Sequence, residues 1–188
     1  GTYTCNITDA NGCPAFATGT IDQPDTLIIL STTTSPATCY GYTDGSATVI
    51  PQGGTPPYTY NWSNLQSTQV ITGLSSGPYS VMVFDANLCP ASENLSVQQP
   101  TQISASLSTI DVLCNGYSTG VITVNGTSGG TGSHIYSWSN VPGGDPINQG
   151  LSAGTYYLTV TDVVGCFNTF DTTITEPTAI STSLIASN

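Results

Sequence analysis

The sequence contains no lysine and no arginine, and this absence excludes several classes of partner. Its 11 Asp and Glu and a single His give a formal net charge of −11 at pH 7. Nucleic acids and anionic membrane surfaces repel a chain of that charge. We therefore predict no nucleic-acid binding and no membrane insertion. Trypsin-like proteases also find nothing to cut, which suits a long-lived extracellular material.

Long apolar runs are also lacking, since none approaches the ~20 residues of a membrane span. No signal peptide opens the chain, which begins with Gly1. Present instead are 20 Gly and 12 Pro, set between short alternating runs of apolar and polar residues. This pattern predicts β-strands joined by turns and not a disordered chain. Six cysteines indicate an oxidising compartment, so we expect an extracellular or cell-surface location.

The chain repeats itself with a period of about 76 residues, which is typical of a tandem array. Three segments, GTYTCNITDANGC, GLSSGPYSVMVFDANLC and GLSAGTYYLTVTDVVGC, end at cysteines that lie 76 and 77 positions apart. The predicted domains are the C-terminal part of a repeat (1–24), two complete repeats (25–100 and 101–177) and the first strand of the next repeat (178–188). We therefore expect an excerpt of a longer chain. Short junctions with φ fixed by proline favour a stiff rod.

Each complete repeat predicts an all-β sandwich of the immunoglobulin or fibronectin-III type. In the first copy we expect strands near 26–34, 46–51, 57–62, 68–72, 79–85 and 92–98. Trp62 and Trp138 are the expected core aromatics. Tyr3, Tyr79 and Tyr156 occupy the place of the corner tyrosine, whose hydroxyl bonds back to the backbone.

Two serines lie in the G-x-S-x-G pattern that holds the nucleophile of α/β-hydrolases, Ser75 and Ser152. That pattern requires a helix after the serine, but here a strand follows directly. The single histidine, His134, occupies a strand position and would have to serve two sites. We therefore interpret both patterns as turns and predict that the chain is not an enzyme.

An aspartate precedes three of the cysteines by four residues, at Asp9, Asp85 and Asp162. Asp-x-Asn-Gly resembles part of a calcium loop, and calcium is the one cofactor that the sequence suggests. The further carboxylates and the terminal Glu of an EF-hand are missing. Asp, Asn and Gly are also standard turn formers, so we favour a turn over a calcium site.

Two disulfide patterns stay open. Pairing Cys39 with Cys89 and Cys114 with Cys166 makes each repeat self-sufficient and stabilises it by roughly 4 kcal/mol, so we favour it. A fibronectin-like strand order places the two loops concerned at opposite ends, which argues for the alternative of Cys39 with the preceding Cys13 and Cys89 with Cys114.

Cys5 has no counterpart in the other repeats. We expect it to be a buried thiol or the partner of Cys13.

Four motifs follow one another in each repeat: C-x-G-x-x-x-G, then GGT with a nearby Y-x-W-S-N, then G-L-S-x-G-x-Y, then an Asp turn that ends in Cys. In combination they resemble the SprB-type repeat of giant cell-surface adhesins from gliding Bacteroidota. The departures are small, since Leu88 replaces a Gly and His134 replaces a strand Tyr. The resemblance implies surface display, export by a type IX system and a role in adhesion or motility, without catalytic residues.

Glycans are a further expected feature. Four Asn residues lie in N-x-S/T sequons and two Thr residues lie in D-T-x sequences that resemble O-glycosylation sites of Bacteroidota. These candidates are Asn6, Asn61, Asn94, Asn125, Thr26 and Thr172.

The sequence thus predicts a structural and adhesive segment that forms a stiff rod or filament. Its expected partners are the neighbouring repeats and identical chains in a fibre, because uncharged Thr-rich edge strands have little protection against pairing. The alternative is a module that binds carbohydrate or another surface. The sequence shows no cluster of exposed aromatic residues for such binding.

Overall fold

The computed structural model describes residues 1–141 and 144–183. Within these residues all regular secondary structure consists of β-strands, so the all-β prediction is confirmed. None of them forms a helix long and apolar enough to span a membrane. The strands in chain order are β1 (Thr2–Thr8), β2 (Pro14–Thr20), β3 (Ile28–Ser35), β4 (Gly45–Gln52), β5 (Thr59–Trp62), β6 (Val70–Leu74), β7 (Gly77–Phe84), β8 (Pro90–Val97), β9 (Ser104–Ile110), β10 (Gly120–Ser128), β11 (His134–Trp138), β12 (Ile147–Leu151), β13 (Gly154–Asp162) and β14 (Phe167–Ile174).

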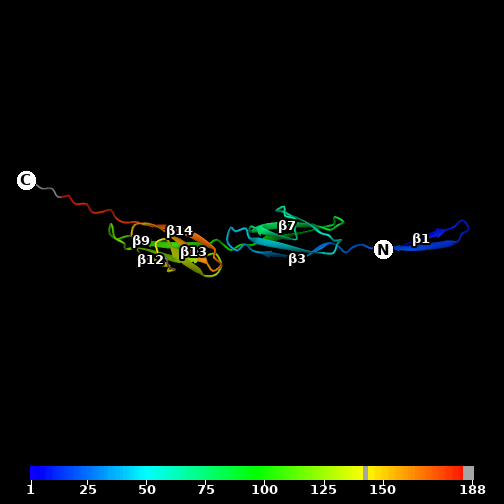
Figure 1. Cartoon of the computed structure of the whole chain (residues 1–188), viewed down its shortest axis with the longest axis horizontal. Helices are drawn as coiled ribbons and strands as arrows, with labels where there is room; N and C mark the ends of the chain where they lie inside the picture. Colours follow the sequence, from blue (N-terminus) through cyan, green and yellow to red (C-terminus); the bar gives the residue numbers. More distant parts are fainter. Residues whose placement is uncertain (142–143, 184–188) are drawn as a thin grey trace, which may run out of the picture. The chain divides into compact units, whose positions relative to one another are not determined.

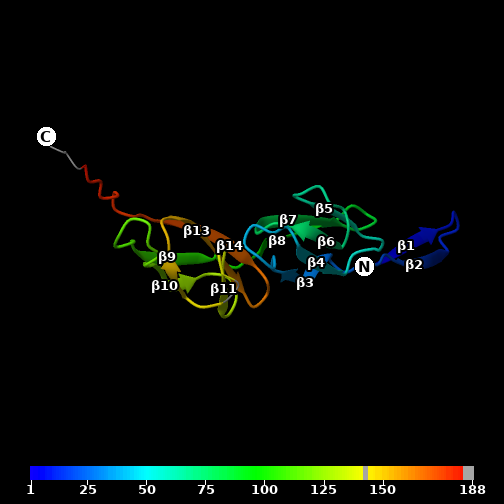
Figure 2. The ribbon, with the colours of Figure 1, turned by 60° about the vertical axis from the view of Figure 1, so that its left-hand side comes forward.

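Each complete sequence repeat contains two three-stranded sheets. In the first repeat the strand orders are β3-β4-β6 and β5-β7-β8, and in the second they are β9-β10-β12 and β11-β13-β14 (Figures 1 and 2). Named by the letters of an immunoglobulin domain, the six strands become A, B, C, E, F and G, and the sheets become ABE and CFG. This is the immunoglobulin-like sandwich order, so the fold-class prediction is confirmed.

Alternation along the strands explains why each sheet has one buried face. In β10, Ile122 and Val124 are buried, and in β13 so are Leu158 and Val160. Trp138 completes this core and is only 5% exposed. Its indole N–H donates to the carbonyl oxygen of Asp145 at 3.0 Å, so its polar atom is satisfied within the fold.

The first repeat uses the same arrangement. Trp62 is buried, and its indole N–H donates to the carbonyl oxygen of Thr68 at 2.8 Å. Both tryptophans are therefore core residues, as predicted.

Inter-residue contacts divide the chain into two compact units whose limits differ from those of the sequence repeats. One unit consists of Gly1–Thr34, Ala47–Ile71 and Pro78–Ser96. The other consists of Ser35–Ser46, Thr72–Gly77 and the chain from Val97 onward. The loop that carries Cys39 therefore belongs to the same compact unit as the second complete repeat.

The first 24 residues form a simple hairpin in which β1 pairs with β2, with Cys5 opposite Ala17. Every residue of both strands is exposed. Cys5 and Cys13 are both exposed free thiols. Our expectation that Cys5 is buried or bonded to Cys13 is therefore wrong. Cys5 lies within β1 opposite Ala17, whereas Cys13 lies in the connection between the two strands.

Candidate functional site: a disulfide-bonded cluster

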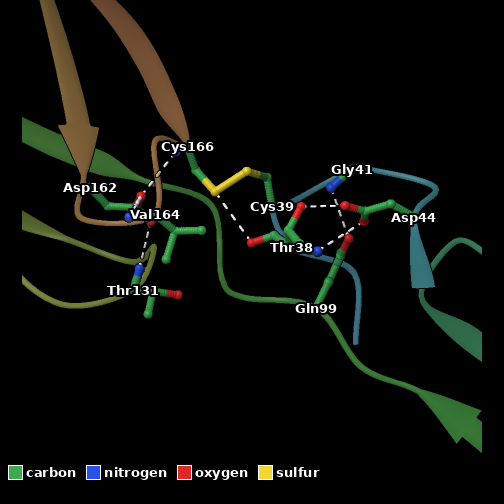
Figure 3. The surroundings of a disulfide bond; sticks show 9 residues. All are labelled: Thr38, Cys39, Gly41, Asp44, Gln99, Thr131, Asp162, Val164 and Cys166. Carbon is green, nitrogen blue, oxygen red and sulfur yellow. Dashed lines mark hydrogen bonds between the residues drawn. A yellow bond between two sulfur atoms is a disulfide. The ribbon is translucent and has the colours of Figure 1, made fainter. Parts of the chain in front are cut away.

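The most distinctive side-chain cluster is built around a disulfide between Cys39 and Cys166, whose Cα atoms are 5.5 Å apart (Figure 3). Both cysteines belong to the second compact unit. In the sequence, however, Cys39 lies in the repeat 25–100 and Cys166 in the repeat 101–177, with a separation of 127 positions. Both disulfide patterns expected from the sequence are therefore wrong, and Cys89 and Cys114 are exposed free thiols.

The strand order explains why a repeat does not bond to itself. Cys39 lies in the A–B loop, between β3 and β4, and Cys89 lies in the F–G turn, between β7 and β8. In an immunoglobulin-like sandwich these two connections lie at opposite ends. A strand of eight residues separates the ends by roughly 26 Å, whereas a disulfide bridges Cα atoms no more than about 7 Å apart.

The loop around Cys39 is held by its own hydrogen bonds. The Asp44 carboxylate accepts the backbone N–H of Thr38 at 2.9 Å and also the Thr38 hydroxyl. These bonds, the hydroxyl above all, hold the pKa of Asp44 below its ordinary value. On the other side, the backbone N–H of Gly41 donates to the Gln99 side-chain oxygen at 2.8 Å. These hydrogen bonds therefore fix the conformation of the loop that carries Cys39.

The turn that ends at Cys166 is organised by one carboxylate. Asp162 Oδ1 accepts the backbone N–H groups of Val164 and Cys166, each at 2.9 Å. Its Oδ2 accepts the backbone N–H of Thr131 at 2.7 Å. Burial alone disfavours the charged form, but the backbone N–H groups outweigh it and lower the pKa of Asp162.

One sulfur also lies close to a backbone oxygen. Cys166 Sγ is 3.3 Å from the carbonyl oxygen of Thr38. A disulfide sulfur has no hydrogen to donate, so this is a packing contact and not a hydrogen bond.

The Gly-Gly-Thr motif supplies the space that the Asp turn requires. A Cβ on Gly129 would lie 2.0 Å from the carbonyl oxygen of Gln102, and one on Gly130 would lie 2.8 Å from Asp162 Oδ2. Both glycines also have positive φ. In the sequence, Gly-Gly-Thr and the Asp turn stand apart as separate motifs, and their common period is the signal that they act together.

The same arrangement recurs in the first repeat. Asp85 accepts the backbone N–H groups of Thr55, Asn87 and Cys89 at 2.8–2.9 Å. These bonds, that of Thr55 first, lower its pKa. Asp9 likewise accepts the backbone N–H groups of Asn11 and Cys13. The turn interpretation of all three aspartates is confirmed.

The calcium interpretation of Asp9, Asp85 and Asp162 stays a prediction. Within the described residues, no three His, Cys, Asp or Glu side chains come together as a metal-binding group. The carboxylate oxygens point at backbone N–H groups, which is the opposite polarity to a cation.

The tyrosine corner is present in the second repeat. Tyr156 donates its hydroxyl to the carbonyl oxygen of Ser152 at 2.9 Å. Ser152 thus lies in a turn that leads into β13, as we expected of both G-x-S-x-G serines. The corresponding Tyr3 is 63% exposed in the hairpin.

His134 takes a structural role. Its Nε2 lies 3.0 Å from the carbonyl oxygen of Gly129, so Nε2 carries the proton, and Nδ1 accepts the hydroxyl of Thr127 at 2.9 Å. In the first repeat, Tyr58 makes the matching bond from its hydroxyl to the carbonyl oxygen of Gly53 at 2.7 Å. The prediction that His134 is a strand residue is confirmed, since it begins β11.

The glycosylation candidates differ in exposure. All four sequon asparagines and Thr26 are exposed, whereas Thr172 is half-buried. The Asn125 side-chain oxygen accepts the Ser108 hydroxyl at 3.1 Å.

A small cavity beside the disulfide brings together aromatic side chains that the sequence pattern did not group. Tyr40, Tyr42 and Phe167 all line it, and each is exposed to about half or more. The expectation of no clustered exposed aromatics is therefore wrong. Phe167 is far from Tyr40 and Tyr42 in the sequence, and the disulfide between Cys39 and Cys166 brings their two loops together.

The SprB repeat family model matches the chain twice, over residues 31–67 and 106–143. No curated protein matches the sequence. Among solved structures, the C-terminal 282-residue fragment of intimin in complex with the intimin-binding domain of its translocated receptor is 13% identical, with a TM-score of 0.40, over 79% of this chain and 64% of the fragment. An eight-domain structure of the Down syndrome cell adhesion molecule is 11% identical, with a TM-score of 0.41, over 94% of this chain and 28% of that one. The chain thus spans less than two thirds of either structure. The two family matches include the A–B loop and the Gly-Gly-Thr motif of each repeat, so the resemblance to the SprB repeat is confirmed at two places in the chain.

Proposed function

We propose that this chain is a non-enzymatic structural and adhesive segment of a giant secreted cell-surface protein, in which tandem immunoglobulin-like repeats form a stiff rod or filament. The observation that carries the proposal is the disulfide between Cys39 of one SprB repeat and Cys166 of the next. A covalent bond between successive repeats has no use in independent binding domains on a flexible string. It does have a use in a segment that transmits force.

The position of the disulfide supports this function mechanically. Residues between Cys39 and Cys166 lie inside a closed loop, and they include β4 to β13. Force applied to the two chain ends passes from β3 through the disulfide to β14. The strands within the loop are therefore shielded from extension for as long as the bond is intact.

Single-molecule force spectroscopy tests the proposal on the complete chain, held at Gly1 and at its C-terminal residue. In the oxidised chain the 127 positions between the cysteines cannot extend. Reduction should therefore lengthen the fully unfolded chain by roughly 450 Å, at about 3.6 Å per residue. The variant Cys5→Ser, which removes a free thiol, should keep the wild-type length. Equal lengths before and after reduction would contradict the proposal.

A second function has one observation in its favour. The cavity lined by Tyr40, Tyr42 and Phe167 offers exposed aromatic faces, the kind of surface that stacks on sugar rings. A glycan array probed with the wild-type chain and a Tyr40→Ala, Tyr42→Ala double variant distinguishes the two functions. A binding module requires a glycan signal that the double variant loses, whereas a purely structural segment gives none.

A further inference from the structure

Two exposed cysteines have no partner in this chain, yet each has an equivalent that forms the disulfide. By the sequence period, Cys114 corresponds to Cys39 and Cys89 corresponds to Cys166. We propose that Cys114 and Cys89 are half-sites of the same disulfide cluster, and that Cys114 accepts the Asp-turn cysteine of a following SprB repeat. This inference rests on the proposed function and names the partner that the rod requires.

The loop around Cys114 repeats the shape of the bonded loop around Cys39. The N–H of Tyr117 donates to the carbonyl oxygen of Cys114 at 3.1 Å, as that of Tyr42 does to Cys39. The N–H of Gly116 donates to Glu176 Oε2 at 2.8 Å, just as Gly41 donates to the Gln99 side chain.

Other bonds of the two loops correspond as well. The N–H of Leu113 donates to the Thr119 hydroxyl at 3.1 Å, in the place of the bond between Thr38 and Asp44. The N–H of Val112 donates to the carbonyl oxygen of Thr175 at 3.0 Å, and Ala37 makes the matching bond. The unpaired loop is thus already in the conformation of the paired one.

The turn at Cys89 likewise repeats the turn at Cys166. The Asp85 and Asp162 carboxylates each accept three backbone N–H groups from equivalent positions. The N–H of Gly54 donates to the carbonyl oxygen of Asp25 at 2.7 Å, and that of Gly130 donates to Thr101 at 2.8 Å. The difference lies in exposure, since Cys166 is 5% exposed and Cys89 is exposed.

Each half-site also borders an open cavity. One is lined by Leu113, Cys114, Tyr117 and Pro177. Leu113 is 77% exposed and Tyr117 is 64% exposed, which leaves an apolar surface around the Cys114 thiol. The occupant with the matching surface is the Asp turn and Gly-Gly-Thr segment of another repeat, because that is what covers Cys39.

Disulfides placed at this period would overlap. The loop closed by Cys39 and Cys166 contains Cys114, so a bond from Cys114 to a later repeat begins inside a loop that is already closed. Successive loops then overlap, and the shortest stretch of chain that connects one bond to the next is the segment from Cys114 to Cys166. Formation of each bond joins two thiolate-derived sulfurs and releases two protons and two electrons, which a disulfide oxidant of the secretory compartment accepts.

An extended chain tests the inference. A second copy of residues 101–177 inserted after Pro177 adds two cysteines to the six already present. The original chain has four free thiols, at Cys5, Cys13, Cys89 and Cys114. If the inserted copy docks on Cys114, the number of thiols titrated under native, oxidised conditions stays at four. In a Cys114→Ser variant of the extended chain, the inserted Asp-turn cysteine loses its partner and the number rises to five.

Peptide mapping of the same samples identifies the bonds. We expect one linked peptide pair containing Cys114 and the inserted counterpart of Cys166, beside the pair of Cys39 with the original Cys166. Six free thiols would overturn the inference. So would a bond from the inserted counterpart of Cys166 to any residue other than Cys114. The Cys39–Cys166 pair, mapped in the same experiment, reports separately on the proposed function. The absence of Lys and Arg requires pepsin or chymotrypsin in place of trypsin.

Discussion

At the scale of single residues, the Asp turns show how a repeat without basic side chains stabilises its carboxylates. No salt bridge to Lys or Arg is available, because the sequence has neither residue. Asp85 and Asp162 therefore take their hydrogen bonds from backbone N–H groups. One of these donors is the Thr of the Gly-Gly-Thr segment. The segment can lie this close to the carboxylate because its glycines have no Cβ.

We expect Gly129→Ala to destabilise the second repeat by about 2 kcal/mol or more. The new Cβ would lie 2.0 Å from the carbonyl oxygen of Gln102, at a φ of +82°. Thermal unfolding followed by circular dichroism measures the loss. Gly126→Ala is the matched control, since a Cβ there meets nothing within 4 Å, and it should leave the melting temperature nearly unchanged. Equal effects of the two substitutions would refute this account of the motif.

The low pKa of Asp85 and Asp162 predicts that the fold loses stability in acid. A carboxyl whose pKa is lower in the folded state stabilises that state above its unfolded pKa of about 4. This contribution is lost as the pH falls through the folded-state pKa. Urea unfolding at a series of pH values should show a constant midpoint above about pH 5 and a falling midpoint below.

Asp162→Asn should weaken this acid dependence and lower the midpoint at neutral pH. The amide keeps one acceptor oxygen, but its NH₂ group then faces the backbone N–H of Thr131, which now donates to Asp162 Oδ2 at 2.7 Å. Wild-type and variant curves of the same shape would rule out Asp162 as a source of the pH dependence.

At the scale of strands and turns, the tyrosine corner fixes the connection between β12 and β13. Tyr156 lies near the start of β13 and reaches back to the turn that follows Leu151. This bond holds β13 to the connection that links the two sheets, because β12 belongs to one sheet and β13 to the other.

Tyr156→Phe should cost about 1 kcal/mol, the usual net value of one intramolecular hydrogen bond. Chemical denaturation of the full chain measures the change. Its neighbour Tyr157 is 56% exposed, and Tyr157→Phe serves as the control with no expected effect. If both variants match the wild type, the corner contributes nothing to stability.

At the scale of the whole molecule, the sequence repeats do not coincide with the compact units of the structure. The Cys39 loop is grouped with the second complete repeat, and its disulfide closes a long loop. The first complete repeat therefore contributes its Cys39 loop to the compact unit that contains the second complete repeat.

Cys39→Ser and Cys166→Ser should each destabilise the second compact unit by about 5 kcal/mol, the chain-entropy value for a loop of this length. Because both variants break the same bond, the double variant should be no less stable than either single one. Calorimetry under oxidising conditions checks this, and the wild type in reducing agent should match the variants. Additive losses in the double variant would contradict the assignment of the bond.

Much of the fold was predictable from local pattern. Alternating apolar residues predicted strands that the structure contains, such as 46–51 within β4 (Gly45–Gln52) and 79–85 at β7 (Gly77–Phe84). The pattern also placed Trp62 and Trp138 in the cores. These features depend on neighbouring residues, which the sequence displays directly.

The cluster around the disulfide was less predictable. The period identified the equivalent cysteines, and the fibronectin-like order already argued against pairing within a repeat. Neither source indicated that Cys39 would meet a cysteine 127 positions away. The aromatic surface of Tyr40, Tyr42 and Phe167 was missed for the same reason, since its members come from separate repeats.

The sequence by itself thus determined the strands, the turns and the SprB repeats, because each depends on side chains within one period. Only the tertiary structure decided which cysteines bond. The A–B loop and the F–G turn of one sandwich are separated by the length of its strands, so neither cysteine can reach the other within its own repeat. Each must find its partner on a different repeat, and which repeat that is depends on distances in space that the sequence spacing does not contain.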